Sequence, residues 1–240
     1  MILPSITHGC AVWLCNTKET VCKVNSIQYT MAKAILQIRS TPASVATLGD
    51  LGWLPINVIL DRARAKYFHR LKHELPQTRL CCRLFDDMME SFNDNDMKVW
   101  PYMSEIKKML NNVGMDHIFR STKQNWMDAF YKLSLEGCKL NFFREIVSKK
   151  SLSWYRAIKR PTFGEVYMND IGNFQGIRLK FMARTGCLGL GEDRERWGHQ
   201  DLSCCLCMAR YENLPHFLFL CHGLNKVRVK HYRFLEKKIN

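Results

Sequence analysis

The sequence predicts a mostly α-helical protein, with one or more irregular helical bundles followed by a small zinc-knuckle module. Apolar residues recur at steps of three and four over long stretches, and no stretch sustains the alternation typical of a half-buried strand. Cysteines and a histidine gather near the C-terminus at spacings that zinc sites use. Apolar residues make up 47% of the 240 residues, which is enough for a hydrophobic core.

The N-terminal part shows three helical patterns. Apolar residues between positions 21 and 38 share one face of a helix of about five turns. Residues 43–51 predict a short helix that Gly52 ends. Pro55 suits the first position of the next helix, because that position needs no backbone N–H, and residues 56–71 carry its apolar stripe.

Helical patterns also dominate the rest of the chain. Residues 78–92 predict a helix that a polar run at 93–96 closes, and two or three further helices are expected between 97 and 150. Residues 177–188 are helical in pattern, and the tail 225–240 mixes apolar with basic residues. We therefore expect a helix directly before the cysteine-rich segment.

Few stretches depart from the helical pattern. Short strands are considered only at 99–102 and 165–168, and residues 161–176 have the composition of a loop. Gly186, Gly189 and Gly191 resemble a phosphate-binding loop only superficially, because no strand pattern precedes them. We interpret these glycines as a flexible connector.

The charge of the chain favours a polyanionic partner. The formal net charge is +14, from 36 lysines and arginines against 22 acidic residues. Residues 151–240 hold 15 of the basic and 8 of the acidic side chains, so the excess is largest around the cysteine-rich segment. Such a balance is typical of proteins that bind nucleic acid or another anionic surface.

The cysteines and the apolar runs bear on the compartment. Eleven cysteines, several of them inside apolar segments, favour a reducing intracellular environment, the cytoplasm or the nucleus. The first residues lack the basic region and the cleavage site of a signal peptide, and no apolar run reaches the roughly 18 residues of a membrane span. We expect no membrane partner, and no motif indicates a small-molecule substrate.

The cysteine-rich segment carries the most specific motif, C-x2-C-x8-H-x4-C. Thiolate sulfur and neutral imidazole are ligands that tetrahedral zinc prefers, and four protein ligands leave no position for a catalytic water. The expected cofactor is therefore a structural zinc ion. Cys205 and His222 stay open as alternative ligands. The four preferred ligands are Cys204, Cys207, His216 and Cys221.

Basic residues near aromatic ones predict a nucleic-acid surface in the same part of the chain. Lysine and arginine contact phosphates, and aromatic rings such as those of Trp154, Tyr155 and Trp197 can stack on single-stranded bases. Each of these rings taken alone is more typical of a core, and the clustered positive charge carries the interpretation. The residues expected to contact RNA or DNA are Arg156, Lys159, Arg160, Arg178, Lys180, Arg184, Arg194, Arg196, Lys226, Arg228 and Lys230.

The triplet Phe85-Asp86-Asp87 is the nearest approach to a catalytic motif. Adjacent carboxylates after an aromatic residue resemble the turn that holds Mg²⁺ in polymerases. The pair lies in a helical pattern, however, and no separate strand pattern ends in a further carboxylate. We interpret both aspartates as part of a solvated helix face and expect no catalytic residue.

Three segments resemble non-LTR (LINE-type) retrotransposon reverse transcriptases. Residues 3–13, Leu-Pro-Ser-Ile-Thr-His-Gly-Cys-Ala-Val-Trp, resemble the LP-x-x-x-Y/H-G-x-x-x-W segment that follows the palm of these enzymes. Residues 48–56 resemble a later stretch of the same proteins. Residues 179–186, together with the Cys/His array, resemble their C-terminal region. The segments occur in the order of the family, and only about 76–170 is unmatched.

The resemblance implies an organisation and a function. Residues 1–75 would form a thumb-like helical segment, 76–176 a helical linker region, and 177–240 a basic zinc-knuckle region that binds RNA, DNA or both. The family copies RNA into DNA with Mg²⁺, but the fingers, the palm carboxylates and the endonuclease have no counterpart in these residues. The expected function is thus nucleic-acid binding without catalysis by this chain alone. The alternative is a helical interaction protein whose zinc ion only staples the C-terminus.

Overall fold

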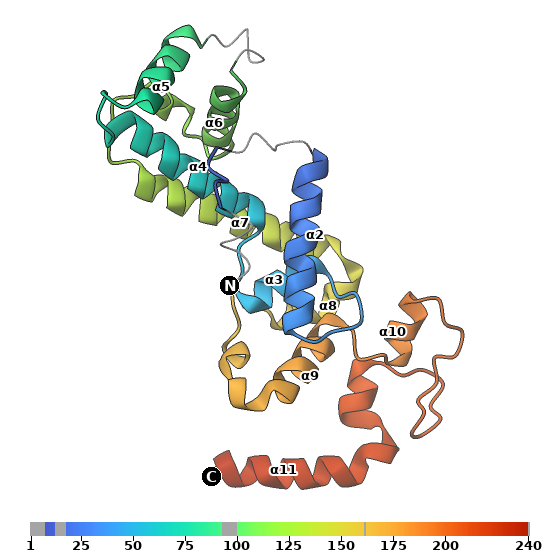
Figure 1. Cartoon of the computed structure of the whole chain (residues 1–240). Helices are drawn as coiled ribbons and strands as arrows, with labels where there is room; N and C mark the ends of the chain where they lie inside the picture. Colours follow the sequence, from blue (N-terminus) through green and yellow to red (C-terminus); the bar gives the residue numbers. More distant parts are fainter. Residues whose placement is uncertain (1–7, 13–17, 93–99, 161, 240) are drawn as a thin grey trace. The chain divides into compact units, whose positions relative to one another are not determined.

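The computed structural model describes residues 8–12, 18–92, 100–160 and 162–239 (Figure 1). As the sequence predicts, the fold is all-α, and no strand occurs within these ranges. The α-helices are Lys18–Ile35 (α2), Ser44–Leu51 (α3), Ile56–His73 (α4), Leu80–Ser91 (α5), Pro101–Asn112 (α6), Met127–Ser148 (α7), Ser153–Ile158 (α8), Phe174–Thr185 (α9), Gly191–Arg196 (α10) and Asn225–Ile239 (α11). Shorter helical turns are Asp116–Ile118 (η1), Lys150–Leu152 (η2), Val166–Asn169 (η3), Ile171–Asn173 (η4), His216–Leu220 (η5) and His222–Leu224 (η6).

The chain folds into two compact units. The first comprises Met1–Ala32 and Gly52–Arg144, and the second comprises Lys33–Leu51 and Glu145–Asn240. The second unit is therefore discontinuous in sequence. The segments 1–75, 76–176 and 177–240 were defined by resemblance rather than by contacts, and they stay predictions. Within the described ranges, no helix is both long and apolar enough to cross a membrane.

The periodic patterns predicted the main helices well. The stretches 21–38, 43–51, 56–71, 78–92 and 177–188 correspond to α2, α3, α4, α5 and α9, with shifts of a few residues at the ends. The polar run 93–96, the start of the chain up to position 7 and residue 13 lie outside the described residues.

Both strand interpretations need correction. Pro101 begins α6, where its missing N–H removes no helical hydrogen bond, so residues 101 and 102 are helical. Residues 166–169 form the 3₁₀ turn η3, in which the N–H of Met168 bonds back to the carbonyl of Glu165 at 3.0 Å. Short stretches of mixed composition do not separate a turn from a strand.

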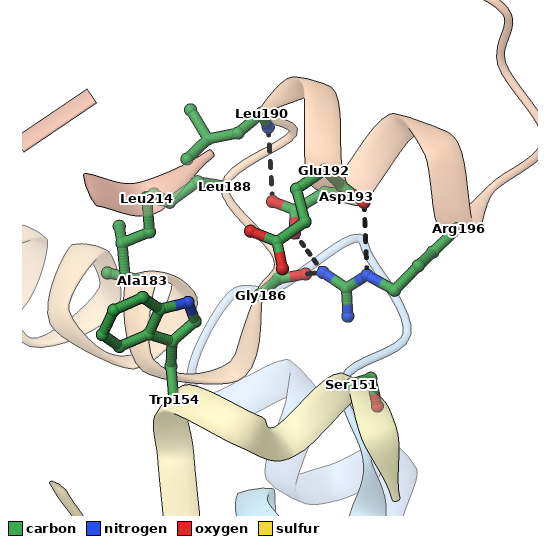
Figure 2. Close-up of a pocket in the computed structure, with 10 residues that line it drawn as sticks. All are labelled: Ser151, Trp154, Ala183, Gly186, Leu188, Leu190, Glu192, Asp193, Arg196 and Leu214. Atoms are coloured by element: carbon green, nitrogen blue, oxygen red, sulfur yellow. Dashed lines mark hydrogen bonds and ion pairs between the residues drawn. The ribbon is translucent and has the colours of Figure 1, made fainter. Parts of the chain in front are cut away.

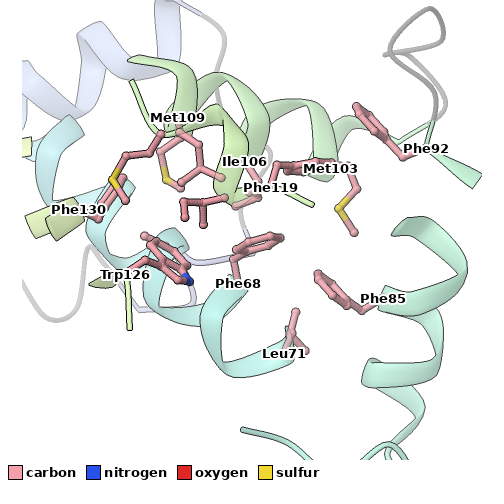
Figure 3. Packing of buried hydrophobic residues seen from close by; sticks show 14 of the residues in the cluster. Phe68, Leu71, Phe85, Phe92, Met103, Ile106, Met109, Phe119, Trp126 and Phe130 are labelled. Carbon is pink, nitrogen blue, oxygen red and sulfur yellow. The ribbon is translucent and has the colours of Figure 1, made fainter. Parts of the chain in front are cut away.

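The core of the first unit is built around Phe68 of α4 (Figure 3). Its ring centroid lies 5.6 Å from that of Phe85, 5.9 Å from that of Phe119 and 6.2 Å from that of Trp126. All four rings are buried. Aromatic pairs at such distances each add about 0.5–1.5 kcal/mol beyond their area burial, so this cluster holds α5 and the segment after α6 against α4.

Polar contacts also fix α4 in the first unit. Gln28 is buried, and its Oε1 accepts the N–H of Ile56 at 3.0 Å while its Nε2 donates to the carbonyl of Leu54 at 2.8 Å. This satisfies one of the N–H groups that a helix start leaves unpaired. Arg62 donates to the carbonyl of Tyr131 at 3.0 Å and ties α4 to α7.

A fully buried carboxylate, that of Asp50, organises the second unit. It accepts hydrogen bonds from the hydroxyls of Tyr155 at 2.7 Å and Tyr167 at 2.6 Å. It also forms ion pairs with Lys159 and Arg184, both with N–O distances of 3.4 Å. Burial raises the pKa of Asp50, and the two hydroxyls and two cations oppose that rise. One side chain of α3 thus joins α8, η3 and α9.

A second carboxylate and an apolar cluster complete this core. Glu165 lies 2.7 Å from the ammonium of Lys159 and 3.1 Å from the guanidinium of Arg184, so the two buried cations face two carboxylates. Beside them, α9 packs its apolar face against the residues that follow α2. The buried members of that cluster are Leu36, Ile38, Ile177 and Phe181.

The glycine segment after α9 is more specific than the flexible connector that we inferred from its composition. Gly186 ends α9 in the left-handed conformation, with φ of 64°, which favours glycine. At Gly191 a Cβ atom would lie 2.1 Å from the carbonyl oxygen of Leu202. Gly186 is therefore favoured by its left-handed backbone, and Gly191 by the lack of space for a side chain.

We predict that Asp50→Ala destabilises the protein by about 3–5 kcal/mol, because it removes the partner of two buried cations and two buried hydroxyls. Urea unfolding followed by circular dichroism measures the change. Asp170→Ala is the matched control, since Asp170 is exposed in the same unit, and it should change the free energy of unfolding by less than about 0.5 kcal/mol. Equal effects of the two substitutions would contradict the role of Asp50.

Candidate metal centre

The first two predicted ligands come from a tight turn. The N–H of Met208 donates to the carbonyl of Cys204 at 2.8 Å, and the N–H of Cys204 donates to the carbonyl of Ala209 at 2.9 Å. Met208 has φ of 58°, the left-handed region that non-glycine residues seldom adopt. This turn places the thiols of Cys204 and Cys207 on one side of the loop.

The other two ligands lie at the two ends of one helical turn. His216 begins η5, and its N–H donates to the side-chain oxygen of Asn213 at 2.8 Å. The N–H of Cys221 donates to the carbonyl of His216 at 2.7 Å, a bond that spans five residues and makes η5 a π-type turn. The wider turn sets the two side chains beside each other.

The four predicted ligands meet in the structure. One ligand atom from each of Cys204, Cys207, His216 and Cys221 lies within 4.8 Å of all the others. The sulfurs of Cys204 and Cys221 are 3.7 Å apart, and the sulfur of Cys207 is 3.3 Å from Nε2 of His216. Cys204 and Cys221 are fully buried, whereas the other two are partly exposed. This Cys3His group could hold a metal ion.

The geometry also decides between the alternative ligands. Cys205 and His222 are both exposed, and neither belongs to the group of converging ligand atoms. The turn that brings the thiols of Cys204 and Cys207 together leaves both residues between them, Cys205 and Leu206, exposed. Cys204 and His216 are therefore the ligands that the structure favours.

The protein environment acts differently on the two thiols of the turn. Burial raises the pKa of Cys204 to about 11, although the backbone N–H groups of Leu206 and Cys207 oppose the rise. The pKa of Cys207 is lowered, chiefly by a hydrogen bond from the backbone N–H of Ala209. At neutral pH, Cys204 is thus protonated in the metal-free protein and must lose its proton when a metal ion binds.

Two arginines that we expected to contact nucleic acid instead support the ligand loops. Arg194 donates to the carbonyl of Ser203 at 2.6 Å and pairs with the buried carboxylate of Glu212 at 3.5 Å. Arg228 of α11 donates to the carbonyl of Cys221. These contacts tie α10 and α11 to the backbone beside the metal ligands. The sequence alone does not show which carboxylates and carbonyls these arginines contact, so both arginines were expected to face solvent.

Three more of the expected contact residues have internal partners. The ammonium of Lys159 is almost fully buried among Asp50, Glu165 and two backbone carbonyls, so its assignment to a nucleic-acid surface needs correction. Arg184 belongs to the same buried cluster. Figure 2 shows Arg196 reaching from α10 to the carboxylate of Asp193 and the carbonyl of Gly186.

The remaining expected contact residues lie at the surface of the second unit. Arg178 is partly buried, whereas five others are exposed and form no ion pair within the described ranges. The five are Arg156, Arg160, Lys180, Lys226 and Lys230. Among the expected stacking residues, Trp154 and Trp197 are exposed, whereas Tyr155 is fully buried at the Asp50 cluster and is not a stacking surface.

Exposed apolar side chains near the predicted ligands were not foreseen from the sequence. Phe219 and Leu220 of η5 are 63% and 64% exposed, and Met208 is 76% exposed. In the sequence, Phe219 and Leu220 form part of an apolar run that is typical of a buried segment. Only the π-type turn, which points His216 and Cys221 inward, shows that the residues between them face solvent.

Comparisons of this chain with protein-family models, with curated protein sequences and with solved structures find no match. The resemblance to LINE-type reverse transcriptases therefore stays a prediction from the segments described above.

We predict that metal affinity strengthens with pH between about 6 and about 8. Each proton that a thiol releases on metal binding raises the apparent association constant about tenfold per pH unit, and Cys204 alone supplies one such proton. Competition with a chromophoric chelator, corrected for the titration of the chelator, measures this slope. An affinity that is constant over this range would contradict the protonated state of Cys204.

Proposed function

We propose that the Cys3His group binds a structural zinc ion. A tetrahedral zinc ion with Zn–S bonds of about 2.3 Å holds two sulfurs about 3.8 Å apart. The sulfurs of Cys204 and Cys221 lie 3.7 Å apart, which supports this assignment. Four protein ligands fill the tetrahedron and leave no position for a catalytic water.

Zinc would stabilise a segment that has few other means of folding. Several apolar side chains between residues 202 and 224 are exposed. The buried side chains of this segment include the proposed ligands Cys204 and Cys221. Structural zinc sites contribute on the order of 10 kcal/mol to the folding of small modules. The bound ion would take the place of a hydrophobic core in this segment.

We further propose that this chain is the C-terminal part of a LINE-type reverse transcriptase and binds RNA or DNA without catalysis of its own. The observation that carries this proposal is the link between the Cys3His group and a basic helix. Cys221 is followed closely by α11, and Arg228 of that helix donates to the carbonyl of Cys221. The zinc ion would thereby position the exposed Lys226 and Lys230.

Other exposed cations of the second unit extend the proposed surface. Arg156, Arg160 and Lys180 are exposed, and Trp154 on α8 offers an aromatic ring close in sequence to the two arginines. Lysines and arginines bind phosphates by neutralising charge and releasing counterions, which needs no base-specific contact. The proposal therefore assigns affinity for the backbone of RNA or DNA, not recognition of a sequence.

We interpret the adjacent aspartates Asp86 and Asp87 as part of a solvated helix face. Both lie in the middle of α5, partly or fully exposed, and not at a turn between two strands. The interpretation of the pair as a solvated helix face is thus confirmed.

A second candidate function is a helical interaction protein with a zinc staple. The adjacent exposed side chains of Phe219 and Leu220 favour it, because apolar side chains grouped at a surface mark sites of protein contact. This function includes zinc but no affinity for nucleic acid, so the two candidates differ in one measurement.

We predict that Cys207→Ser reduces the zinc bound per purified chain to well below one ion, because serine is a poor zinc ligand. Cys205→Ser is the matched control, since it makes the same chemical change at a neighbouring exposed position, and it should retain zinc. Elemental analysis by mass spectrometry gives the metal content. Loss of zinc from the Cys205 variant alone would show that the ligand assignment is wrong.

We predict that the affinity for single-stranded RNA falls steeply with salt and that Lys226→Gln/Lys230→Gln makes the dependence shallower. Each lost phosphate contact reduces the slope of log K against log salt by about 0.7 on a single strand. Fluorescence anisotropy across a salt series measures the slopes. Lys66→Gln/Lys132→Gln removes two exposed lysines of the first unit and should leave the slope unchanged.

The same titration separates the two candidate functions. Wild-type protein that retains zinc but shows no salt-dependent binding to RNA or DNA would support the interaction protein and overturn the nucleic-acid proposal. Equal slopes for both double variants would mean that α11 does not contact the phosphates.

A further inference from the structure

Helix α5 of the first unit carries an exposed apolar stripe. Leu80 is 71% exposed and Leu84 is 53% exposed. Met88, one turn later, is partly buried, packs against the core as well and ends the stripe. Residues four apart lie on the same side of a helix, so these side chains form one row along α5. The core of the first unit uses the neighbouring side of the helix, where Cys82 and Phe85 are buried.

An apolar groove runs beside this stripe, between α5 and α4. Its volume is about 240 Å³, and almost all of its lining is apolar. Grooves of this kind bind an amphipathic helix, whose apolar side chains insert at intervals of three or four residues. The lining residues are Val12, Tyr67, Leu71, Cys81, Leu84, Phe85, Met88 and Tyr102.

The charges on α5 are divided along the helix. Arg79 and Arg83 lie near its start, and Asp87 and Glu90 lie near its end. All four side chains are exposed and form no ion pair within the described residues. At 100° per residue, Arg83, Asp87 and Glu90 fall on the same flank of the apolar stripe. Arg79 is the extended residue directly before the helix. The flank is thus basic at one end and acidic at the other.

This pattern is complementary to itself when one copy of the helix is reversed. In an antiparallel pair related by a two-fold axis, equal flanks face each other. An axis near Leu84 would bring Leu84 against Leu84 of the second copy and Leu80 against Met88 of the second copy. The same axis would bring Arg83 within about 3 Å of Asp87, and Arg79 within about 1.5 Å of Glu90, measured along the helix axis. Long charged side chains span such offsets, so the apolar and the charged contacts fit nearly the same register.

We propose that a second copy of this chain covers the stripe and groove, through antiparallel packing of α5 against α5 about a two-fold axis. The charge order along the flank favours a second copy over an unrelated helix. Binding an unrelated helix would not require that the basic end of the flank be complementary to its own acidic end. This dimer depends neither on the metal ion nor on nucleic acid.

Analytical ultracentrifugation of the full chain over a concentration series tests the dimer, after nuclease treatment to exclude bridging by nucleic acid. The wild-type protein is expected to shift from monomer to dimer as its concentration rises. Leu84→Asp places two like charges at the two-fold axis and should leave only monomer. Leu140→Asp is the matched control, because Leu140 is 59% exposed on α7 of the same unit, and it should still dimerise.

Charge reversal distinguishes this interface from a general loss of structure. Arg83→Glu and Asp87→Arg, each alone, place like charges opposite each other twice per dimer and should weaken the dimer about tenfold or more. The double variant R83E/D87R restores both pairs across the axis and should recover most of the wild-type affinity. Circular dichroism confirms that each variant keeps its helical content.

Three results would overturn the proposal. The first is a wild-type chain that stays monomeric over the whole concentration range, which would leave the groove for a different protein. The second is a dimer in which Leu84→Asp and Leu140→Asp behave alike. The third is a double charge reversal that is no better than either single reversal.

Discussion

The buried carboxylate of Asp50 is the constraint on which the second unit depends. A carboxylate without water needs charged and hydrogen-bonding partners, because an isolated buried charge is very unfavourable. Two tyrosine hydroxyls and two cations meet this need, and they come from three different elements after Glu145. The positions of α8, η3 and α9 around α3 therefore follow from the solvation of one side chain.

This constraint changes the meaning of the positive charge in the C-terminal half. The sequence shows an excess of basic residues there, but Lys159 and Arg184 form ion pairs with Asp50 inside the protein. Arg194, Arg196 and Arg228 bond to loop backbone or to nearby carboxylates. The surface that is free to meet a polyanion is smaller than the net charge suggests, and it depends on the residues that remain exposed.

The fold could be predicted from the sequence to the extent that local pattern determines it. The long helices follow from apolar periodicity, since a repeat of three and four residues buries one helix face. The buried ion pairs could not be predicted, because Asp50 and its tyrosine partners are separated by 105 and 117 residues. Nothing near Lys159 in the sequence marks it as buried. The 3₁₀ turn at 166–169 and the close approach at Gly191 likewise depend on tertiary contacts.

The candidate metal site was more predictable, because its four ligands lie within one short segment. Spacing alone selected Cys204, Cys207, His216 and Cys221, and the structure brings these residues together. Spacing could not exclude Cys205 or His222, which depend on the direction of a turn with a left-handed residue at Met208. The exposure of Phe219 was also not predictable, because it results from a π-type turn that few sequences form.

The discontinuity of the second unit has a consequence for the order of folding. Residues Lys33–Leu51 are synthesised before Gly52–Arg144, which belong to the first unit. Their partners in the second unit, within Glu145–Asn240, are synthesised only after that. Until α8 and α9 are synthesised, Asp50 and the apolar residues after α2 have no native neighbours, whereas the cluster around Phe68 can already close. In a nascent chain, the side chains of α3 thus wait longest for their native partners. Contacts between residues so far apart in sequence form slowly, and we expect them to limit the rate at which the second unit folds.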